Sequence, residues 1–271
     1  MNLKLIGEII GIVAIVERFF IFLSNRRKNI LNLLDKNGSV RVTELSRLFS
    51  ISEVTIRSDL ADMENKGLLT RVHGGAVSSY KPYYNMSLNQ RMSTNQEHKE
   101  IIANKIADMI EDNDTIMLNS GTTTLLVFRA IPRNLNLSIV TNSISIALEG
   151  TTNPNFNIIL LGGLINPKYQ FTFGDDAIRQ LKSYHADKLI LSVDGIDPEH
   201  GFSTYYDKEA EIDRIMLEQS SVNIVAADHS KFNRRAFTKI SDLSVADYII
   251  TDTNISDSIK NKLKKQSIKL K

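Results

Sequence analysis

The sequence predicts an α/β protein of two domains, in which a small helical module with a β-hairpin precedes a larger body built on a parallel sheet. Two observations support this division. Residues 43 to 77 combine helix-period apolar residues, a turn and an alternating strand pattern, whereas short apolar runs alternate with helical stretches after residue 94. The chain has 271 residues and is 42% hydrophobic, so each domain can bury a core of its own.

Residues 1–22 form an apolar extension of uncertain role in front of the module. The run from Leu5 to Leu23 is apolar and is followed by three basic residues, a pattern also found at membrane spans. Glu8, Glu17 and Arg18 interrupt the run, and charges at the centre of a bilayer are costly, so a membrane anchor is the least favoured role. An extra packing helix or an unusual translation start is favoured over a disordered or artefactual leader.

The first helix of the module is predicted to begin at Thr43. Its hydroxyl can cap free amide groups, and Leu45 and Leu48 follow three residues apart on one face. Ile51 ends this helix, which leaves a tight turn before the next one.

The second helix is predicted to begin at Ser52 and Glu53 and to stop before Gly67. Short polar side chains and an arginine in the first turn of a helix suit base edges and phosphates in the major groove of DNA. The buried side is expected to consist of Val54, Ile56, Leu60 and Met63, and the outward side of Ser52, Thr55, Arg57 and Ser58.

Alternating apolar and polar residues from Leu68 to Val77 predict a small hairpin that carries Arg71 and His73 before the Gly74-Gly75 turn. Such a wing can contact the sugar-phosphate backbone of DNA. The alternative is that the two helices only pack against another part of the protein, because amphipathic helix pairs are common. The candidate DNA contacts are Thr43, Ser52, Glu53, Thr55, Arg57, Ser58, Arg71 and His73.

Charge is distributed unevenly, although the formal net charge is only +2. Residues 24–75 hold nine Lys and Arg against six Asp and Glu, whereas residues 76–254 hold 16 basic and 22 acidic side chains. A basic module on an acidic body indicates that the body does not bind DNA. The tail, residues 255–271, carries six lysines against one aspartate, and a solvated, frayed helix end is favoured over a DNA contact.

The segment SISEVTIRSDLADMENKGLLTRVHGGAV resembles the winged helix-turn-helix of the DeoR family of bacterial sugar-metabolism repressors. The family pattern is roughly V-S-x-x-T-I-R-R-D-L, then L-E-x-x-G, then R-x-H-G-G-A. The resemblance implies a DNA-binding domain over residues 23–78 with double-stranded operator DNA as its partner. Ser58 stands where the family usually has a second arginine, so we expect weaker nonspecific binding and an altered operator preference.

The body is predicted to occupy residues 94–254, after a linker at residues 79–93 that is rich in Tyr, Pro, Ser and Asn. The capping-box spacing of Thr94 and Glu97 opens its first helix. Alternation of apolar runs with helices indicates a Rossmann-like parallel sheet covered on both faces. The strand-like runs are residues 115–118, 137–140, 157–161, 188–193, 222–226 and 248–250.

Ligands bind such sheets where strands end and helices begin. The first strand is followed by Asn119, Ser120, Gly121, Thr122, Thr123 and Thr124, where amides, hydroxyls and a helix N-terminus can converge on one anion, with phosphate as the natural occupant. The alternative is a Ser/Thr-rich turn that only caps a helix. Further strand ends and helix starts carry Gly162, Gly163, Asp194, Gly195, Glu209 and Lys231; each is a weak signal alone, and their recurrence favours a polar ligand site.

The motifs SGTTT, VTNS with Asn142, LLGG, DGID, KEAE and ADHSKF resemble the effector-sensing domain of the DeoR family, so the resemblance covers about residues 23–252. It implies a fold similar to ribose-5-phosphate isomerase and the coenzyme A transferases. It also implies a phosphorylated sugar or sugar derivative as effector, with Ser120 to Thr124 on the phosphate and Asp194, Glu209 and Lys231 around the polyol. Asn119 replaces the aspartate common there, which is expected to raise phosphate affinity or to shift the sugar preference.

Two functions are compatible with these patterns. The first is a transcriptional regulator, a repressor of carbohydrate uptake or catabolism genes, that a sugar phosphate controls. The second is a phosphosugar isomerase with Asp194 or Glu209 as general base. The DNA-binding module favours the regulator, with no catalytic residue and no cofactor. Since one module covers a single half-site, we expect a homodimer or homotetramer formed through the body.

Cysteine and histidine content bear on metal sites. The chain has no cysteine, which excludes disulfides and thiolate metal sites and fits a cytoplasmic location. Its five histidines are scattered along the sequence, so no zinc cluster and no other metal site is predicted.

Overall fold

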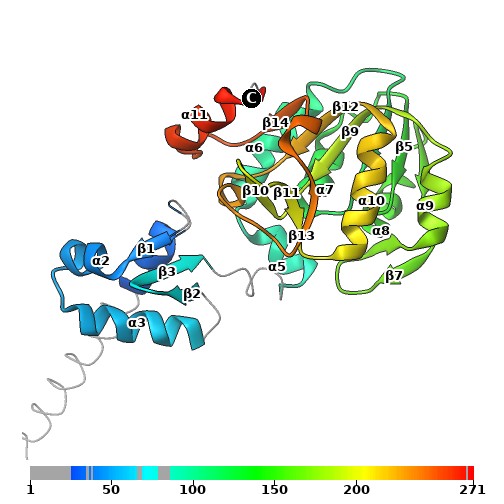
Figure 1. The fold of residues 1–271 in the computed structure, drawn as a ribbon. Helices are drawn as coiled ribbons and strands as arrows, with labels where there is room; N and C mark the ends of the chain where they lie inside the picture. The colour runs from blue at the N-terminus through cyan, green and yellow to red at the C-terminus, as the bar shows by residue number, and fades with distance from the viewer. Residues whose placement is uncertain (1–25, 35–36, 38, 66–68, 79–85, 267) are drawn as a thin grey trace, which may run out of the picture. The chain divides into compact units, whose positions relative to one another are not determined.

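The computed structural model describes residues 26–34, 37, 39–65, 69–78, 86–266 and 268–271. The chain divides into two compact units, Met1–Pro82 and Tyr83–Lys271 (Figure 1). The N-terminal extension at residues 1–22 lies outside the described residues, as do Gly67 and the first part of the predicted linker. Among the helices that are described, none has the length and apolar character needed to cross a bilayer.

The N-terminal unit combines a helix over residues 26–34 with a helix pair and a three-stranded antiparallel sheet (Figure 1). The sheet order is β1-β3-β2, so the predicted hairpin forms and gains one further strand that the sequence did not predict. The elements are β1 (Ser39–Arg41), α2 (Val42–Phe49), α3 (Glu53–Asn65), β2 (Leu69–Val72) and β3 (Gly75–Ser78).

The structure corrects two predictions for α2. The helix begins at Val42 and has no side-chain cap bond at its N-terminus, so Thr43 lies inside the first turn and does not cap it. Leu48, predicted to share an apolar face with Leu45, is 62% exposed. The core face instead passes through Val42, Leu45 and Phe49, whose spacings of three and four residues keep them on one side of the helix.

In α3, one residue of the predicted buried side faces solvent. Ile56 and Met63 are fully buried as predicted, whereas Val54 is 73% exposed. Val54 lies two residues before Ile56, which places it about 200° around the helix from the core face. A hydrophobic residue in the first turn therefore does not belong to the apolar stripe that follows it.

A buried ion pair joins the helix at residues 26–34 to α3. Asp59 is 2% exposed and accepts hydrogen bonds from Arg26 at 2.6 Å and from Arg27 Nε at 3.0 Å. Arg27 also pairs with the more exposed Asp62 at 2.7 Å. Since a buried charge is tolerated only when it is paired and hydrogen-bonded, these arginines fix the two helices against each other.

The C-terminal unit is built on a six-stranded parallel sheet in the order β14-β12-β9-β4-β5-β6 (Figure 1). All six strands coincide with predicted apolar runs, and each boundary agrees within two residues. The strands are β4 (Thr115–Leu118), β5 (Leu137–Thr141), β6 (Phe156–Leu160), β9 (Ala186–Ser192), β12 (Ser220–Ala226) and β14 (Tyr248–Ile250).

Alternate side chains of each strand pack on opposite faces of the sheet. In β4, Ile116 and Leu118 belong to one apolar cluster and Met117 to another, so the sheet is buried on both faces as predicted. The first cluster includes side chains of α6 (Gln96–Ala107), α7 (Thr122–Ala130) and α8 (Ile144–Gly150), and the second includes those of α9 (Asp175–Leu181), α10 (Asp207–Glu218) and α11 (Asp257–Lys265).

Short elements decorate the loops that connect the main strands. The antiparallel pair is β7 (Leu164–Asn166) with β8 (Phe171–Phe173), and the small sheet is β10 (Gly195–Asp197), β11 (Gly201–Thr204) and β13 (Thr238–Ser241). The part of the chain that the structure describes also has two 3-10 turns, η1 (His229–Lys231) and η2 (Leu243–Val245). None of these was predicted, because three or four residues are too few to display a period.

A helix, α5 (Leu88–Ser93), occupies the end of the predicted linker. Its capping box is formed by Ser87 and Gln90, whereas α6 has Asn95 as N-cap without a side-chain cap bond. The capping box predicted at Thr94 is therefore wrong, although α6 begins close to the predicted position. The matching Ser-x-x-Gln spacing one helix earlier carries the real signal.

The basic tail packs against the unit. Ile259 and Leu263 of α11 are buried in the core, and Leu270 forms an isolated bridge with Ile249 beside β14. The expected frayed helix end is therefore wrong, because two apolar residues four apart anchor the helix.

Candidate functional site

A pocket opens at the carboxyl ends of β4 and β9, which are neighbours in the sheet. In parallel sheets this edge gathers loops from several strands. The lining residues are Leu88, Arg91, Ser120, Gly121, Thr122, Thr123, Tyr169, Ser192, Val193, Asp194, Thr204, Tyr205, Tyr206, Glu209 and Lys231.

The loop between β4 and α7 forms the anion-attracting wall of the pocket. Helix α7 begins at Thr122, with Gly121 as N-cap and without a side-chain cap bond. The first amides of a helix have no partner within it and carry the positive end of its dipole, so they attract anions. A Cβ on Gly121 would lie 2.1 Å from Ser192 Oγ, so any larger residue at this position would require the Ser192 side chain to move.

Two cationic side chains reach the same pocket. The Arg91 guanidinium lies 4.5 Å from the centroid of the Tyr169 ring and 3.5 Å from Asp194 Oδ1. Lys231 is 4% exposed, and burial lowers its pKa to about 8 although the carboxylates of Asp228 and Asp194 act in the opposite direction. At neutral pH both side chains are mainly protonated, so together with the α7 amides they can balance a bound anion.

Two carboxyl groups face these cations. Glu209 lies 3.0 Å from Ser120 Oγ and 2.8 Å from Thr204 Oγ1, and burial together with the charge of Asp194 raises the pKa of Glu209 to about 7. Thr204 Oγ1 also lies 3.1 Å from Asp194. A hydroxyl has one proton, so it cannot donate to both carboxylates. A proton on Glu209 satisfies both contacts, which agrees with its raised pKa.

Seven of the thirteen predicted effector-binding residues come together here, and six do not line the pocket. Those that line it are Ser120, Gly121, Thr122, Thr123, Asp194, Glu209 and Lys231. Those that do not are Asn119, Thr124, Asn142, Gly162, Gly163 and Gly195.

The side chains of Asn119 and Thr124, at the two ends of the loop, are hydrogen-bonded within the protein. Asn119 is fully buried, and its Nδ2 donates to Ser192 O and to Asp213 Oδ1, both at 3.0 Å. Thr124 Oγ1 lies 2.8 Å from Asn119 O and 3.0 Å from Gly121 O. These contacts fix the loop from behind, so neither side chain is available to a ligand.

The remaining four residues serve backbone packing. Asn142 Nδ2 donates to Thr172 O at 3.4 Å, beside β8. Gly163 has φ +138°, and a Cβ there would lie 2.5 Å from Phe173 O. A Cβ on Gly195 would lie 2.7 Å from Arg234 O, and Gly162 N donates to Gln180 Oε1 at 3.0 Å. The glycines permit close approach of another chain segment rather than of a ligand.

Several pocket residues were not predicted from the sequence. Arg91 lies on α5, inside the predicted linker, and Tyr169 lies in the β7–β8 turn. Thr204, Tyr205 and Tyr206 connect β11 to α10. The capping-box spacing at residues 87–90 is the one signal that pointed to α5 and hence to its arginine.

The outward face of α3 carries the polar residues predicted to contact DNA. Ser52 Oγ accepts a hydrogen bond from Thr55 N at 3.2 Å, which confirms the predicted start of the helix. Arg57 and Ser58 are exposed beside them. Arg57 Nη2 lies 2.6 Å from Glu53 Oε2, and both side chains remain more than 40% exposed, so the guanidinium can exchange this surface partner for another anion.

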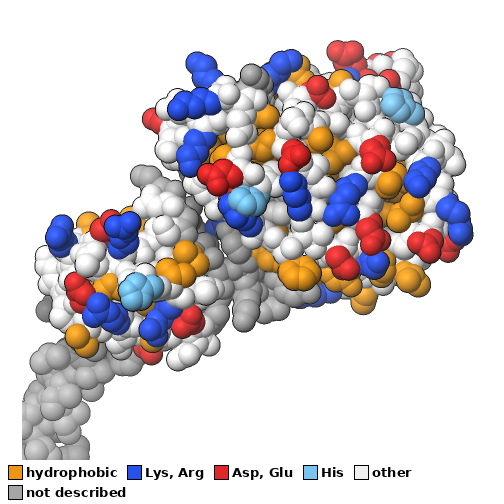
Figure 2. Space-filling model, in the orientation of Figure 1, with side chains coloured by type: hydrophobic (Ala, Val, Ile, Leu, Met, Phe, Trp, Pro, Cys, Tyr) orange, Lys and Arg blue, Asp and Glu red, His pale blue; other side chains and the backbone are white. Residues whose placement is uncertain are grey.

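The hairpin presents a second set of exposed residues. Arg71 and His73 are exposed at the β2–β3 turn, and the Arg71 amide donates to Glu64 Oε1 at 2.8 Å, which ties the hairpin to α3. Thr43 is exposed on the first turn of α2. Figure 2 shows Lys and Arg side chains on either side of a histidine on the visible face of this unit. The surface suits a polyanion.

A helix pair with an exposed polar first turn, a basic hairpin and a separate unit with an anion-attracting pocket define a DNA-binding protein that can respond to a small ligand. Residues 26–81 match the DeoR-like helix-turn-helix domain, and residues 94–253 match the DeoR C terminal sensor domain. The chain therefore belongs to the DeoR family and is a DNA-binding transcriptional regulator.

Named relatives align along most of the chain. A protein of Escherichia coli O157:H7 named putative aga operon transcriptional repressor is 36% identical over 239 residues, which cover 87% of this chain and 89% of the relative. The glycerol-3-phosphate regulon repressor of Escherichia coli strain K12 is 32% identical over 229 residues, covering 84% and 90%. Among solved structures, ribose 5-phosphate isomerase A from Methanocaldococcus jannaschii aligns with a TM-score of 0.38 and 16% identity, over 51% of this chain and 55% of that one.

Proposed function

We propose that this protein is a repressor of carbohydrate uptake or catabolism genes whose affinity for operator DNA is controlled by a phosphorylated sugar or sugar derivative. The observation that carries the proposal is the pocket at the ends of β4 and β9, where an uncapped helix N-terminus and two cations face two carboxyl groups. The names of the two relatives, repressors of an aga operon and of a glycerol-3-phosphate regulon, support the same function.

The two kinds of polar group divide between the two ends of such an effector. The amides and hydroxyls of residues 120–123, with Arg91 and Lys231, suit a phosphate because they provide donors and positive charge. Asp194 and the protonated Glu209 suit sugar hydroxyls, because a carboxylate accepts and a carboxylic acid donates hydrogen bonds. The effector is thus held by groups from five separate segments of the chain.

The DNA contacts are assigned to α3, the hairpin and α2 of the N-terminal unit. Ser52, Thr55, Arg57 and Ser58 enter the major groove on α3, while Arg71 and His73 reach the sugar-phosphate backbone from the hairpin. Thr43 meets a phosphate from the first turn of α2, and Glu53 holds Arg57 in place until DNA displaces it.

Self-association through the C-terminal unit completes the proposed repressor. The unit exposes Leu148 on α8, Leu160 on the edge strand β6, and Leu164 and Ile165 on β7. Exposed apolar side chains on adjacent elements favour burial against a second copy. A dimer or tetramer would place two DNA-binding units on repeated half-sites and so raise the overall affinity for operator DNA.

Effector control is tested by gel-shift titration of the purified protein on its own promoter with a panel of aldose, ketose and triol phosphates. One phosphoester is expected to release the DNA without being converted to a product. Thr123→Ala removes a pocket hydroxyl and should raise the concentration for release about tenfold while leaving DNA affinity unchanged. Thr152→Ala, which alters an exposed hydroxyl away from the pocket, is the matched control. Turnover of any panel member would instead favour an isomerase.

Arg57→Ala is expected to weaken operator binding by about 1 to 3 kcal/mol if the guanidinium contacts a guanine edge, and to relax specificity at that position. Fluorescence anisotropy with operator and random duplexes measures both effects. Arg179→Ala, which removes an exposed arginine paired with Asp176 in the C-terminal unit, controls for loss of net charge. Equal losses on both duplexes would mean that Arg57 contacts only phosphates.

The affinity of the pocket for the phosphoester is expected to fall as pH rises from 6.5 to 9. Glu209 gains a negative charge above its pKa of about 7, and Lys231 loses its positive charge above its pKa of about 8. Both changes disfavour an anion, each by about tenfold at contact distance. Calorimetric titration at several pH values measures the profile, and Glu209→Gln should remove the step near pH 7 only. A flat profile in the parent protein would contradict the assignment of these groups to the effector pocket.

A further inference from the structure

Two histidines that are far apart in the sequence meet at one carboxylate outside the pocket. His98 lies at the start of α6, His229 lies on η1, and Asp252 follows β14. The two rings stand edge to face with centroids 4.7 Å apart. His229 Nδ1 lies 3.0 Å and His98 Nδ1 lies 3.4 Å from Asp252 Oδ1. One ligand atom from each residue lies within 4.8 Å of the other two.

These separations match the coordination sphere of a small transition metal. In a tetrahedral zinc site, bonds of about 2.0 to 2.1 Å place neighbouring ligand atoms about 3.3 Å apart. Both nitrogen-to-carboxylate distances in the cluster fall within a few tenths of an ångström of that value. From these ligand distances we propose that His98, His229 and Asp252 bind one divalent transition-metal ion, with Zn²⁺ as the natural occupant.

Two further observations support a ligand at this place. His98 Nδ1 is buried and makes no hydrogen bond among the described residues, although it points at the cluster. Asp252 is fully buried, while the histidine side chains are 28% and 20% exposed, so the site can be reached from solvent on the imidazole side.

The hydrogen bonds of Asp252 also suit a metal ligand. Its carboxylate accepts the backbone amides of His229 at 2.7 Å and Asn254 at 2.8 Å, which hold it in place beside the two rings. One carboxylate with two neutral imidazoles is a common ligand set for zinc and related ions.

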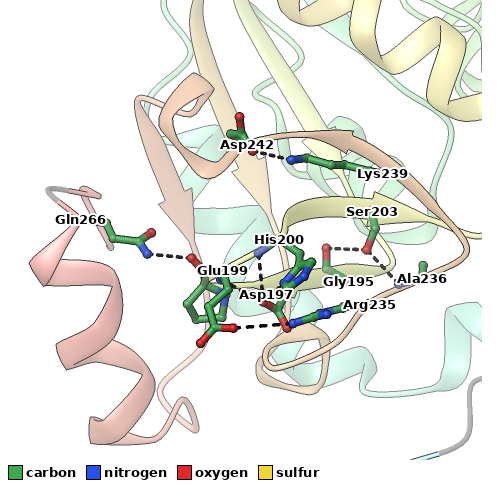
Figure 3. Close-up of polar contacts among 11 residues, drawn as sticks. Gly195, Asp197, Glu199, His200, Ser203, Arg235, Ala236, Lys239, Asp242 and Gln266 are labelled. Atoms are coloured by element: carbon green, nitrogen blue, oxygen red, sulfur yellow. Dashed lines mark hydrogen bonds and ion pairs between the residues drawn. The ribbon is translucent and has the colours of Figure 1, made fainter.

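Residues that could bind a metal ion also cluster at Asp197, Glu199 and His200. In this second cluster the carboxylates already have a cationic partner. Arg235 lies 2.8 Å from Asp197 and 3.8 Å from Glu199. Figure 3 shows it against both carboxylates. Asp197 also accepts the backbone amides of Glu199 and His200 within the β10–β11 turn. A guanidinium already neutralises this group, so its carboxylates serve the turn rather than a metal.

A metal held by His98, His229 and Asp252 would fix the frame of the pocket. His229 and Lys231 belong to the same one-turn helix η1, and Asn95 Nδ2 donates to Asp228 Oδ1 at 3.1 Å at the junction of α6 and η1. The ion would therefore link η1 to α6. The turn η1 supplies Lys231 to the pocket, and α6 directly follows α5, which supplies Arg91.

Metal binding is tested with the full-length, metal-free protein. Titration with Co²⁺, whose visible absorption reports tetrahedral coordination, and displacement by Zn²⁺ in competition with a chelating dye should give one ion per chain. His98→Asn and His229→Asn should each weaken binding by at least about tenfold. His185→Asn, a surface histidine of the same unit that contacts Ser221, should bind like the parent.

Thermal unfolding supplies an independent readout. Zn²⁺ should raise the melting temperature of the C-terminal unit in the parent and in His185→Asn but not in His98→Asn. His98 lies at the rim, so its variant should stay folded, as circular dichroism can verify. Absence of the cobalt absorption in the parent, or equal affinity in the parent and in His98→Asn, would overturn the proposal.

Discussion

Replacing Asp59 with alanine is expected to unfold the N-terminal unit while the C-terminal unit stays folded. The side chains of Asp59 and Arg26 are 3% and 5% exposed, and Asp59 Oδ2 lies 2.6 Å from Arg26 Nη2. The carboxylate therefore compensates the buried charge of Arg26. Removing one partner of a buried ion pair costs about 3 to 5 kcal/mol, because the other charge is left without compensation. A unit of this size has little stability in reserve, so the loss should exceed what the helices and hairpin can bear.

Differential scanning calorimetry of the full chain measures this effect. Two transitions are expected for the parent, and Asp59→Ala should lose the one that belongs to the N-terminal unit, together with specific operator binding. Effector binding, measured by titration calorimetry, should be unchanged because the pocket residues all belong to the C-terminal unit.

Asp62→Ala is the matched control. Asp62 lies one turn further along α3 and pairs with Arg27 at 2.7 Å, but its side chain is 53% exposed. Exposed pairs contribute at most about 1 kcal/mol, so this variant should keep both transitions and its operator affinity. If Asp59→Ala were as stable as Asp62→Ala, the polar anchor between the two helices would have no structural importance.

The contrast between these two aspartates illustrates what the sequence can and cannot reveal. The stripe through Ile56 and Met63 is visible as a helical period, and so are the six continuous apolar runs of the sheet. Burial of Asp59 depends instead on its pairing with Arg26 from another helix, and no local sequence pattern predicts that contact. Partners distant in the sequence decide which polar residues become structural.

The pocket follows the same rule. Sequence spacing locates the loop after β4 and the acids and lysine at later strand ends, because parallel strands bring their carboxyl ends to one edge. It does not locate Arg91, which arrives from a helix before the sheet begins. Nor does it separate Thr123, which faces the pocket, from its neighbour Thr124, which turns inward onto the loop carbonyls.

The second large effect is expected for Asn119→Asp, which should destabilise the C-terminal unit by an amount on the order of 3 kcal/mol at neutral pH. Asn119 Nδ2 donates to Ser192 O and to Asp213 Oδ1. An oxygen in place of Nδ2 would lie 3.0 Å from Ser192 O and 3.0 Å from Asp213 Oδ1. No hydrogen bond can form between these oxygens unless one of the two acids is protonated. Urea unfolding, followed by circular dichroism at pH 8 and at pH 5, measures the loss.

The loss should depend on pH in a defined direction. Burial and the charge of Glu209 already hold the pKa of Asp213 well above its ordinary value, and a second buried carboxyl beside it would also have a raised pKa in the folded state. The folded state then binds more protons than the unfolded state, so stability falls as pH rises above about 4, the unfolded pKa of an aspartate. The deficit of Asn119→Asp should therefore be larger at pH 8 than at pH 5.

The double variant Asn119→Asp with Asp213→Asn separates charge from shape. An amide at position 213 can donate to the new carboxylate, so the pairing between the two side chains is restored with the roles of donor and acceptor exchanged. Only the contact with Ser192 O stays unfavourable, and most of the lost stability should return. Asp213→Asn alone should cost little, since the amide keeps the acceptor that Asn119 uses.

These variants also decide between two roles for position 119. The family resemblance predicts that asparagine there, by removing a charge beside the anion loop, raises phosphate affinity or shifts the sugar preference. The contacts assign it instead to the back of that loop, where it joins β4 to β9 and α10. If Asn119→Asp left stability unchanged and altered the affinity for a sugar phosphate, the side chain would belong to the pocket after all. The opposite result is a loss of stability in Asn119→Asp that the double variant restores, while the affinity for a sugar phosphate is preserved. In that case the charge at position 119 matters for the core beneath the pocket and not for the ligand.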